Sequence, residues 1–107
     1  MPPTYLEAPA NLETLTEPQW QNQVIHVLSW YGWHWIHIRA MIGNRAGIPD
    51  LLCFRGERGL MIELKAMRGK LGIAQSEFIA EAQSKGTDVH VLRPCLDDWN
   101  KLLELVR

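Results

Sequence analysis

The chain has 107 residues, of which 47% are hydrophobic and 21% are charged, and its formal net charge is −1. This length predicts one globular domain with a real core and leaves no room for a second folded unit. No apolar run approaches the roughly 20 residues that span a bilayer, and the first residues lack the basic and apolar regions of a secretory signal. The two cysteines show no zinc-ligand spacing. We therefore expect a cytoplasmic protein with no membrane segment and no zinc site.

An extended arm is predicted at the N-terminal end, over residues 1–15, because prolines interrupt it and its apolar residues show no sustained period. Helical periodicity then begins at Thr16, which with Gln19 fits a capping box, and it continues up to Gly32. We expect a single domain over residues 16–107.

Three strands are predicted to follow the first helix. Residues 33–39 are aromatic or branched on both faces, as expected for a strand covered on both sides. Residues 50–54 and 60–65 read as a hairpin that turns through residues 55–59.

The last third of the chain predicts a helix, a strand and another helix. A glycine-punctuated basic loop leads to a helix over about residues 73–85, which Gly86 ends. Residues 89–92 form the fourth strand, and Asp97 can cap a last helix. A hairpin is antiparallel, whereas the helical crossover into the fourth strand favours parallel pairing, so the four-stranded sheet should be mixed.

Glu63 and Lys65 are the most informative residues, because alternate residues of a strand project from the same face. The predicted hairpin brings Asp50 back to a position across from them. Two carboxylates about 4 Å apart repel by roughly 4 kcal/mol at the effective dielectric of a protein surface. A divalent ion would neutralise the pair and bind phosphate oxygens, and an all-oxygen site suits Mg²⁺ or Mn²⁺. The pattern therefore predicts metal-dependent hydrolysis of a phosphodiester.

Taken singly, these acids have simpler interpretations: Asp50 as a turn residue after a proline, and Glu63 as a solvent-facing strand residue. Their joint spacing with Lys65 favours the site. Gln75 shares a predicted helix face with apolar residues, where a polar side chain needs a partner. It is expected to line the site; the alternative is a helix-start residue bonded to backbone.

Basic residues are concentrated around this pattern. Residues 39–70 contain seven basic side chains against three acidic ones, and this local excess suits a phosphate backbone despite the overall charge of −1. The basic residues are Arg39, Arg45, Arg55, Arg58, Lys65, Arg68 and Lys70. The alternative is that Arg55, Arg58, Arg68 and Lys70 are solvated turn residues.

The pair Pro49-Asp50 followed by Glu63-Leu64-Lys65 resembles the signature of the PD-(D/E)xK nuclease superfamily. Within it, residues 47–51, Gln75 and the strand end at residues 89–94 resemble the virus-type replication-repair nuclease (VRR-Nuc) family in its small stand-alone form. The resemblance covers nearly the whole chain past residue 16. It implies an α/β, restriction-endonuclease-like αβββαβ core with a mixed four-stranded sheet flanked by helices, plus a C-terminal helix.

The resemblance also implies roles for single residues. Asp50, Glu63 and the main-chain carbonyl of Leu64 would ligate one or two metal ions, and Lys65 would be the catalytic lysine. Glu17, in the first turn of the first helix, would be a further acidic ligand. The helix dipole alone also favours an acid at that position, and Gln21 is the rival for the same task.

The expected substrate is DNA. The resemblance implies a homodimer acting on branched DNA, in the manner of a Holliday-junction resolvase, in a bacterial or phage-infected cell. Flaps, single strands and ordinary duplex stay open as substrates. Asn44, Arg45, Arg68 and Lys70 are the expected phosphate contacts. Two alternatives are a non-catalytic nucleic-acid-binding subunit of the same fold and a purely structural oligomerisation domain.

Overall fold

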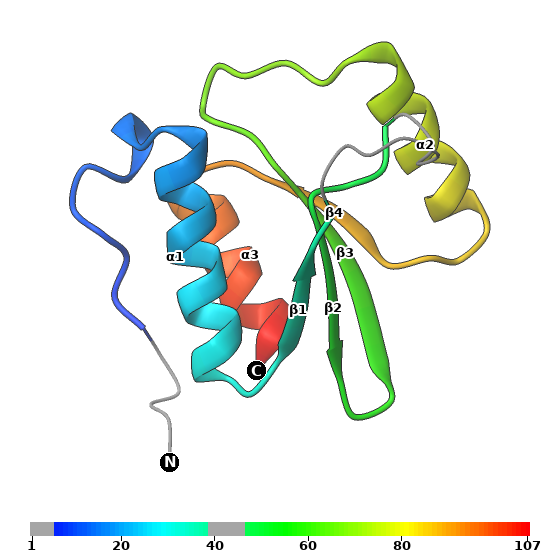
Figure 1. Cartoon of the computed structure of the whole chain (residues 1–107). Coiled ribbons are helices and arrows are strands. Elements are labelled where there is room, and N and C mark those ends of the chain that lie inside the picture. Colours follow the sequence, from blue (N-terminus) through cyan, green and yellow to red (C-terminus); the bar gives the residue numbers. More distant parts are fainter. Residues whose placement is uncertain (1–5, 39–46) are drawn as a thin grey trace.

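The computed structural model of the chain describes residues 6–38 and 47–107. Its helices and strands follow the predicted order, with one short 3-10 helix added near the N-terminal end (Figure 1). In chain order they are η1 (Leu12–Thr14), α1 (Glu17–Trp30), β1 (His34–His37), β2 (Leu51–Arg55), β3 (Arg58–Leu64), α2 (Ile73–Ser84), β4 (Val89–Leu92) and α3 (Leu96–Val106).

The four strands form one mixed sheet in the order β1-β2-β3-β4. Antiparallel pairing joins β1 to β2 and β2 to β3, whereas β3 and β4 are parallel. The parallel pair follows from the α2 crossover, which returns the chain to the same end of the sheet. The predicted fold class, with its mixed sheet and flanking helices, is confirmed.

Helices α1 and α3 cover one face of the sheet, and α2 lies on the other side (Figure 1). The capping box of Thr16 and Gln19 starts α1 as predicted. Trp20 of α1 is fully buried and its indole Nε1 donates to the carbonyl oxygen of Leu92 at 2.9 Å, which fixes the start of α1 against the end of β4. The main core lies between this helix pair and the sheet and includes the inward-facing residues of β3, namely Leu60, Ile62 and Leu64.

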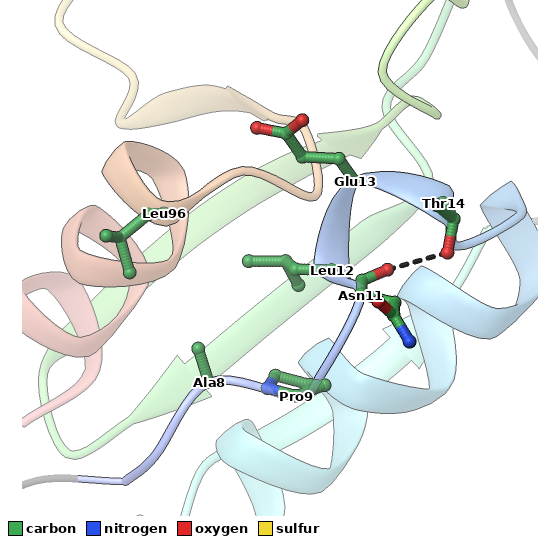
Figure 2. Close-up of a pocket in the computed structure, with 7 residues that line it drawn as sticks. All are labelled: Ala8, Pro9, Asn11, Leu12, Glu13, Thr14 and Leu96. Carbon is green, nitrogen blue, oxygen red and sulfur yellow. Dashed lines mark hydrogen bonds between the residues drawn. The ribbon is translucent and has the colours of Figure 1, made fainter.

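The N-terminal arm packs on its own domain in the part that the structure describes. Leu12 is buried within η1, and the indole Nε1 of Trp99 donates to the carbonyl oxygen of Leu6 at 3.1 Å. A groove of about 400 Å³ lies between this arm and the start of α3 (Figure 2). It is lined by Ala8, Pro9, Asn11, Leu12, Glu13, Thr14 and Leu96, which include none of the predicted site residues.

Three local predictions are wrong. Strand β1 is not covered on both sides: it lies at one edge of the sheet, and Trp35 and Ile36 are 39% and 52% exposed. The hairpin turn is two residues long, since β2 and β3 extend to Arg55 and Arg58. Asp97 does not cap α3, because the N-cap is Cys95. None of the helices in the described part is both long and apolar enough to cross a membrane.

Candidate active site

Asp50 and Glu63 meet where β2 begins and β3 ends. Leu51 pairs with Ile62 across the hairpin, so Asp50 lies one step further, opposite Glu63 and on the same face. The Asp50 carboxylate Oδ2 accepts a hydrogen bond from the backbone N–H of Leu64 at 2.8 Å, and its carbonyl oxygen accepts one from Ile38 at 2.7 Å. These bonds fix Asp50 against both neighbouring strands.

Glu63 is a buried carboxylate with one satisfied oxygen. Only 1% of the residue's surface is exposed to solvent. Oε2 accepts a hydrogen bond from Nε2 of Gln75 at 3.0 Å and lies 3.5 Å from Nζ of Lys65. Oε1 is buried and has no hydrogen-bond partner within the described structure. A buried polar atom without a partner is costly to keep and points to an unseen ligand or to a functional role.

The surroundings of Glu63 disfavour its ionised form. Its pKa is raised from 4.5 to about 7, chiefly by burial and then by the negative charge of Asp50. The ammonium of Lys65 lowers the pKa, and Glu17 raises it as the smallest contribution. One lysine therefore does not compensate the group of carboxylates, and a further cation would stabilise the ionised form.

Gln75 joins α2 to the sheet. Its Oε1 accepts a hydrogen bond from the backbone N–H of Gly72 at 2.8 Å, while its Nε2 donates to Glu63. The bond to Gly72 fixes the orientation of the amide, so that its NH₂ group points at the carboxylate. Both interpretations of Gln75 hold together, since it bonds to backbone at the helix start and also faces the site.

The loop after Lys65 is shaped by Arg93, which the sequence interpretation did not single out. Its guanidinium Nη1 donates to the carbonyl oxygens of Ala66, Met67 and Gly69. The backbone N–H of Arg93 donates in turn to Asp98 at the start of α3, at 2.7 Å. The only sequence signal was a basic residue at the end of a strand, because the carbonyl groups that it binds carry no side-chain signature.

Not all of the basic side chains of residues 39–70, called here the basic rim, lie around the site. Arg55 and Arg58 do not: they lie at the turn end of the hairpin and donate to the last carbonyl groups of the chain. The last carbonyl groups of a helix have no partner within the helix, and cations are favoured there. The two arginines fill this role at the end of α3. Arg68 and Lys70 are exposed in the loop after the site. Asn44 and Arg45 lie outside the described residues.

Glu17 is the first residue of α1 and is exposed, and Gln21 lies one turn later and is half-buried. In residues 6–38 and 47–107, no three His, Cys, Asp or Glu side chains are grouped closely enough to hold a metal ion. Asp50 and Glu63 are the two acidic residues that lie opposite each other at this end of the hairpin. Carboxylate oxygens suit hard cations such as Mg²⁺, and the unpartnered Oε1 of Glu63 fits a bound cation. The metal-ligand roles stay predictions.

Comparisons with known proteins agree with this arrangement. A family model described as the VRR-NUC domain matches residues 13–94. A solved structure described as a VRR_NUC domain protein is similar with a TM-score of 0.65 and 26% sequence identity, over 86% of this chain and 88% of that one. Among curated proteins, none matches the chain. Because the family model covers well over half of the residues, the chain belongs to the VRR-NUC domain family and carries a nuclease-type domain.

Proposed function

We propose that the protein is a divalent-metal-dependent endonuclease that hydrolyses phosphodiester bonds in DNA. The observation that carries the proposal is the buried Oε1 of Glu63, beside Asp50 and Lys65, which has no hydrogen-bond partner among residues 6–38 and 47–107. A structural carboxylate at this depth would be expected to have partners for both oxygens. A carboxylate that binds a cation during function has one oxygen to spare in the metal-free fold.

Asp50, Glu63 and the main-chain carbonyl of Leu64 would hold Mg²⁺ or Mn²⁺. When bound, such an ion polarises the phosphoryl group, lowers the pKa of water and neutralises the leaving oxygen. Asp50 is already oriented by its bond to the Leu64 N–H, and Glu63 by Gln75. Lys65, whose Nζ lies beside Oε2 of Glu63, would orient the attacking water and balance negative charge at the phosphate. Glu17 would supply the further acidic group, with Gln21 as the rival.

The proposed substrate is branched DNA, cut by a homodimer. One site of this kind cuts one strand, so symmetric cleavage of a four-way junction requires two sites related by a two-fold axis. Arg68 and Lys70 are exposed on the loop that leaves the site and can contact the phosphate backbone. Such contacts position DNA without reading its sequence, which suits recognition by shape. Flaps and single strands are the alternative substrates.

The test is incubation of the protein with labelled junction, flap, duplex and single-stranded DNA in Mg²⁺ or Mn²⁺, beside Asp50→Asn and Lys65→Ala. We expect cleavage that requires the metal, with the junction cut fastest, and loss of cleavage in both variants. Arg107→Ala is the control, because Arg107 makes an exposed ion pair with Glu104 at the C-terminal end. Metal-independent cleavage, or full activity in both site variants, would defeat the proposed mechanism. DNA that binds but stays intact would favour the non-catalytic binding subunit.

Glu17 is tested separately, with Glu17→Gln and Gln21→Ala compared in the same cleavage assay over a range of Mg²⁺ concentrations. A higher Mg²⁺ requirement in the Glu17 variant alone would support Glu17 as the acidic ligand. The opposite result would transfer the role to Gln21.

A further inference from the structure

A close backbone contact joins the loop before Asp50 to the first turn of α2. Gly47 has a φ of +87°, and a Cβ added to it would lie 2.3 Å from the carbonyl oxygen of Ala74 and 2.8 Å from the backbone nitrogen of Gln75. Such distances are too short for any non-bonded Cβ contact. Glycine is therefore required here twice over, for the positive φ and for the missing side chain.

Helix α2 buries little of its surface, so the contact with Gly47 bears directly on where its first turn lies. Of the twelve residues of α2, only Ile79 is buried. Near its C-terminal end, Nε2 of Gln83 donates to the carbonyl oxygen of Val89 at 2.9 Å. At its N-terminal end, the helix meets the site through the bond from Gln75 to Glu63 and through the contact with Gly47. An element with so little buried surface is displaced more readily than a central strand.

The loop on the other side of the contact is held more firmly. Pro49 is buried and fixes its own φ. Asp50 is bonded to β3 through Leu64 and to Ile38, just after β1. A Cβ at residue 47 would therefore move the first turn of α2 away from the loop, and the Gln75 side chain would move with it.

We propose that Gly47 is a positioning residue, whose missing side chain lets the first turn of α2 approach closely enough for Gln75 to hold Glu63. Its effect on cleavage rests on the nuclease function proposed above. Its effect on the placement of Gln75 does not, because that effect concerns only the bond from Gln75 to Glu63.

The first test uses Gly47→Ala and a matched control, Gly32→Ala. Gly32 also has a positive φ, +79°, but a Cβ added to it would meet no atom within 4 Å. The control therefore carries the backbone strain without the collision. In metal-free protein, the side-chain amide signal of Gln75 is followed by ¹H–¹⁵N NMR and assigned by its absence in Gln75→Ala. We expect Gly47→Ala to move this signal to the position of a solvated amide, and Gly32→Ala to leave it in place.

The second test uses cleavage of junction DNA. A misplacement of this size is expected to lower kcat by about 100-fold with little change in KM. In a Gln75→Ala background the same change at residue 47 should have little further effect, because two residues that act through one contact are not additive. Any effect of Gly32→Ala on activity should be the same with Gln75 present and with Gln75 replaced by alanine. If no variant and no wild-type protein cuts DNA, the nuclease proposal fails while the NMR test still decides the role of Gly47.

Gly47→Asn guards against a variant that does not fold, since Asn tolerates a positive φ better than Ala and keeps the Cβ. A folded Gly47 variant with the wild-type Gln75 signal would overturn the proposal. So would the same signal shift in Gly32→Ala. Failure of both Gly47 variants to fold, with Gly32→Ala folded, would also overturn it, because Gly47 would then be a requirement of the whole fold.

Discussion

The two ends of the β2–β3 hairpin carry charged residues that the fold treats in opposite ways. At the turn end, Arg55 and Arg58 lie over the ring of Trp33, at 5.0 and 4.9 Å from its centroid, and donate to carbonyl groups at the end of α3. At the open end, Glu63 is buried, and one of its oxygens has no partner in the part of the chain that the structure describes. Paired charges at one end complete the structure, whereas an incompletely paired charge at the other marks the site where function is expected.

The sharpest way to break this contrast is Glu63→Gln. We expect the rate of cleavage to fall by about 1000-fold, since a metal ligand contributes several kcal/mol to the stabilisation of the transition state. Thermal stability of the metal-free protein at pH 8 should rise, because a buried negative charge is removed. Activity assays and thermal unfolding on the same preparation check both. Loss of activity together with loss of stability would show that Glu63 serves the fold rather than the site.

The pH dependence of stability gives the next largest effect. Because the pKa of Glu63 is raised from 4.5 to about 7, the folded protein keeps a proton that the unfolded chain releases between those values. Its contribution to the free energy of unfolding is therefore constant below pH 4.5, falls between pH 4.5 and 7, and is constant above. The total loss is on the order of 3 kcal/mol.

Urea unfolding of wild type and Glu63→Gln in EDTA, from pH 4 to 8, isolates this contribution as the difference between the two proteins. The difference should grow as pH rises to about 7, and added Mg²⁺ should shrink it at pH 8. A difference that does not change with pH would contradict the raised pKa.

A substitution at the turn end should lower stability and leave cleavage unchanged, the opposite of the effect expected at the site. Arg55→Met keeps part of the side-chain packing over Trp33 but leaves carbonyl oxygens of Tyr31 and Val106 without this donor. We expect a loss of about 1–3 kcal/mol in the free energy of unfolding, with cleavage per folded molecule unchanged. Urea unfolding and active-site titration separate the two quantities. A fall in DNA affinity without loss of stability would return Arg55 to the basic rim that the sequence predicted.

The difference between the two ends also explains what could be predicted from sequence. Strand alternation placed Glu63 and Lys65 on one face, and a polar Gln75 on an apolar helix face required a partner, because both patterns are local. The sequence pattern assigned Arg55 to the basic residues around the site, because its true partners are backbone carbonyl groups far along the chain. Gly47 and Arg93 act through backbone contacts of the same kind, which side-chain patterns do not reveal. The metal-binding and catalytic roles stay predictions.

The smallest expected effect comes from Arg93→Lys, which tests whether a charge at the site end can also be structural. The guanidinium donates through Nη1 to three carbonyl groups of the loop after Lys65. A lysine ammonium keeps the charge but is more strongly hydrated and sits on a flexible stem without the planar guanidinium, so it should hold these carbonyl groups less firmly. We expect about 1 kcal/mol less stability and faster amide hydrogen exchange confined to residues 66–70. Arg107→Lys is the control, because that residue makes an exposed pair with Glu104. If exchange in the loop is unchanged, Arg93 does not hold it. If exchange rises and DNA affinity falls with it, Arg93 holds the loop in the shape that presents the exposed Arg68 and Lys70 to DNA. This one loop would then contain both a structural charge and functional charges.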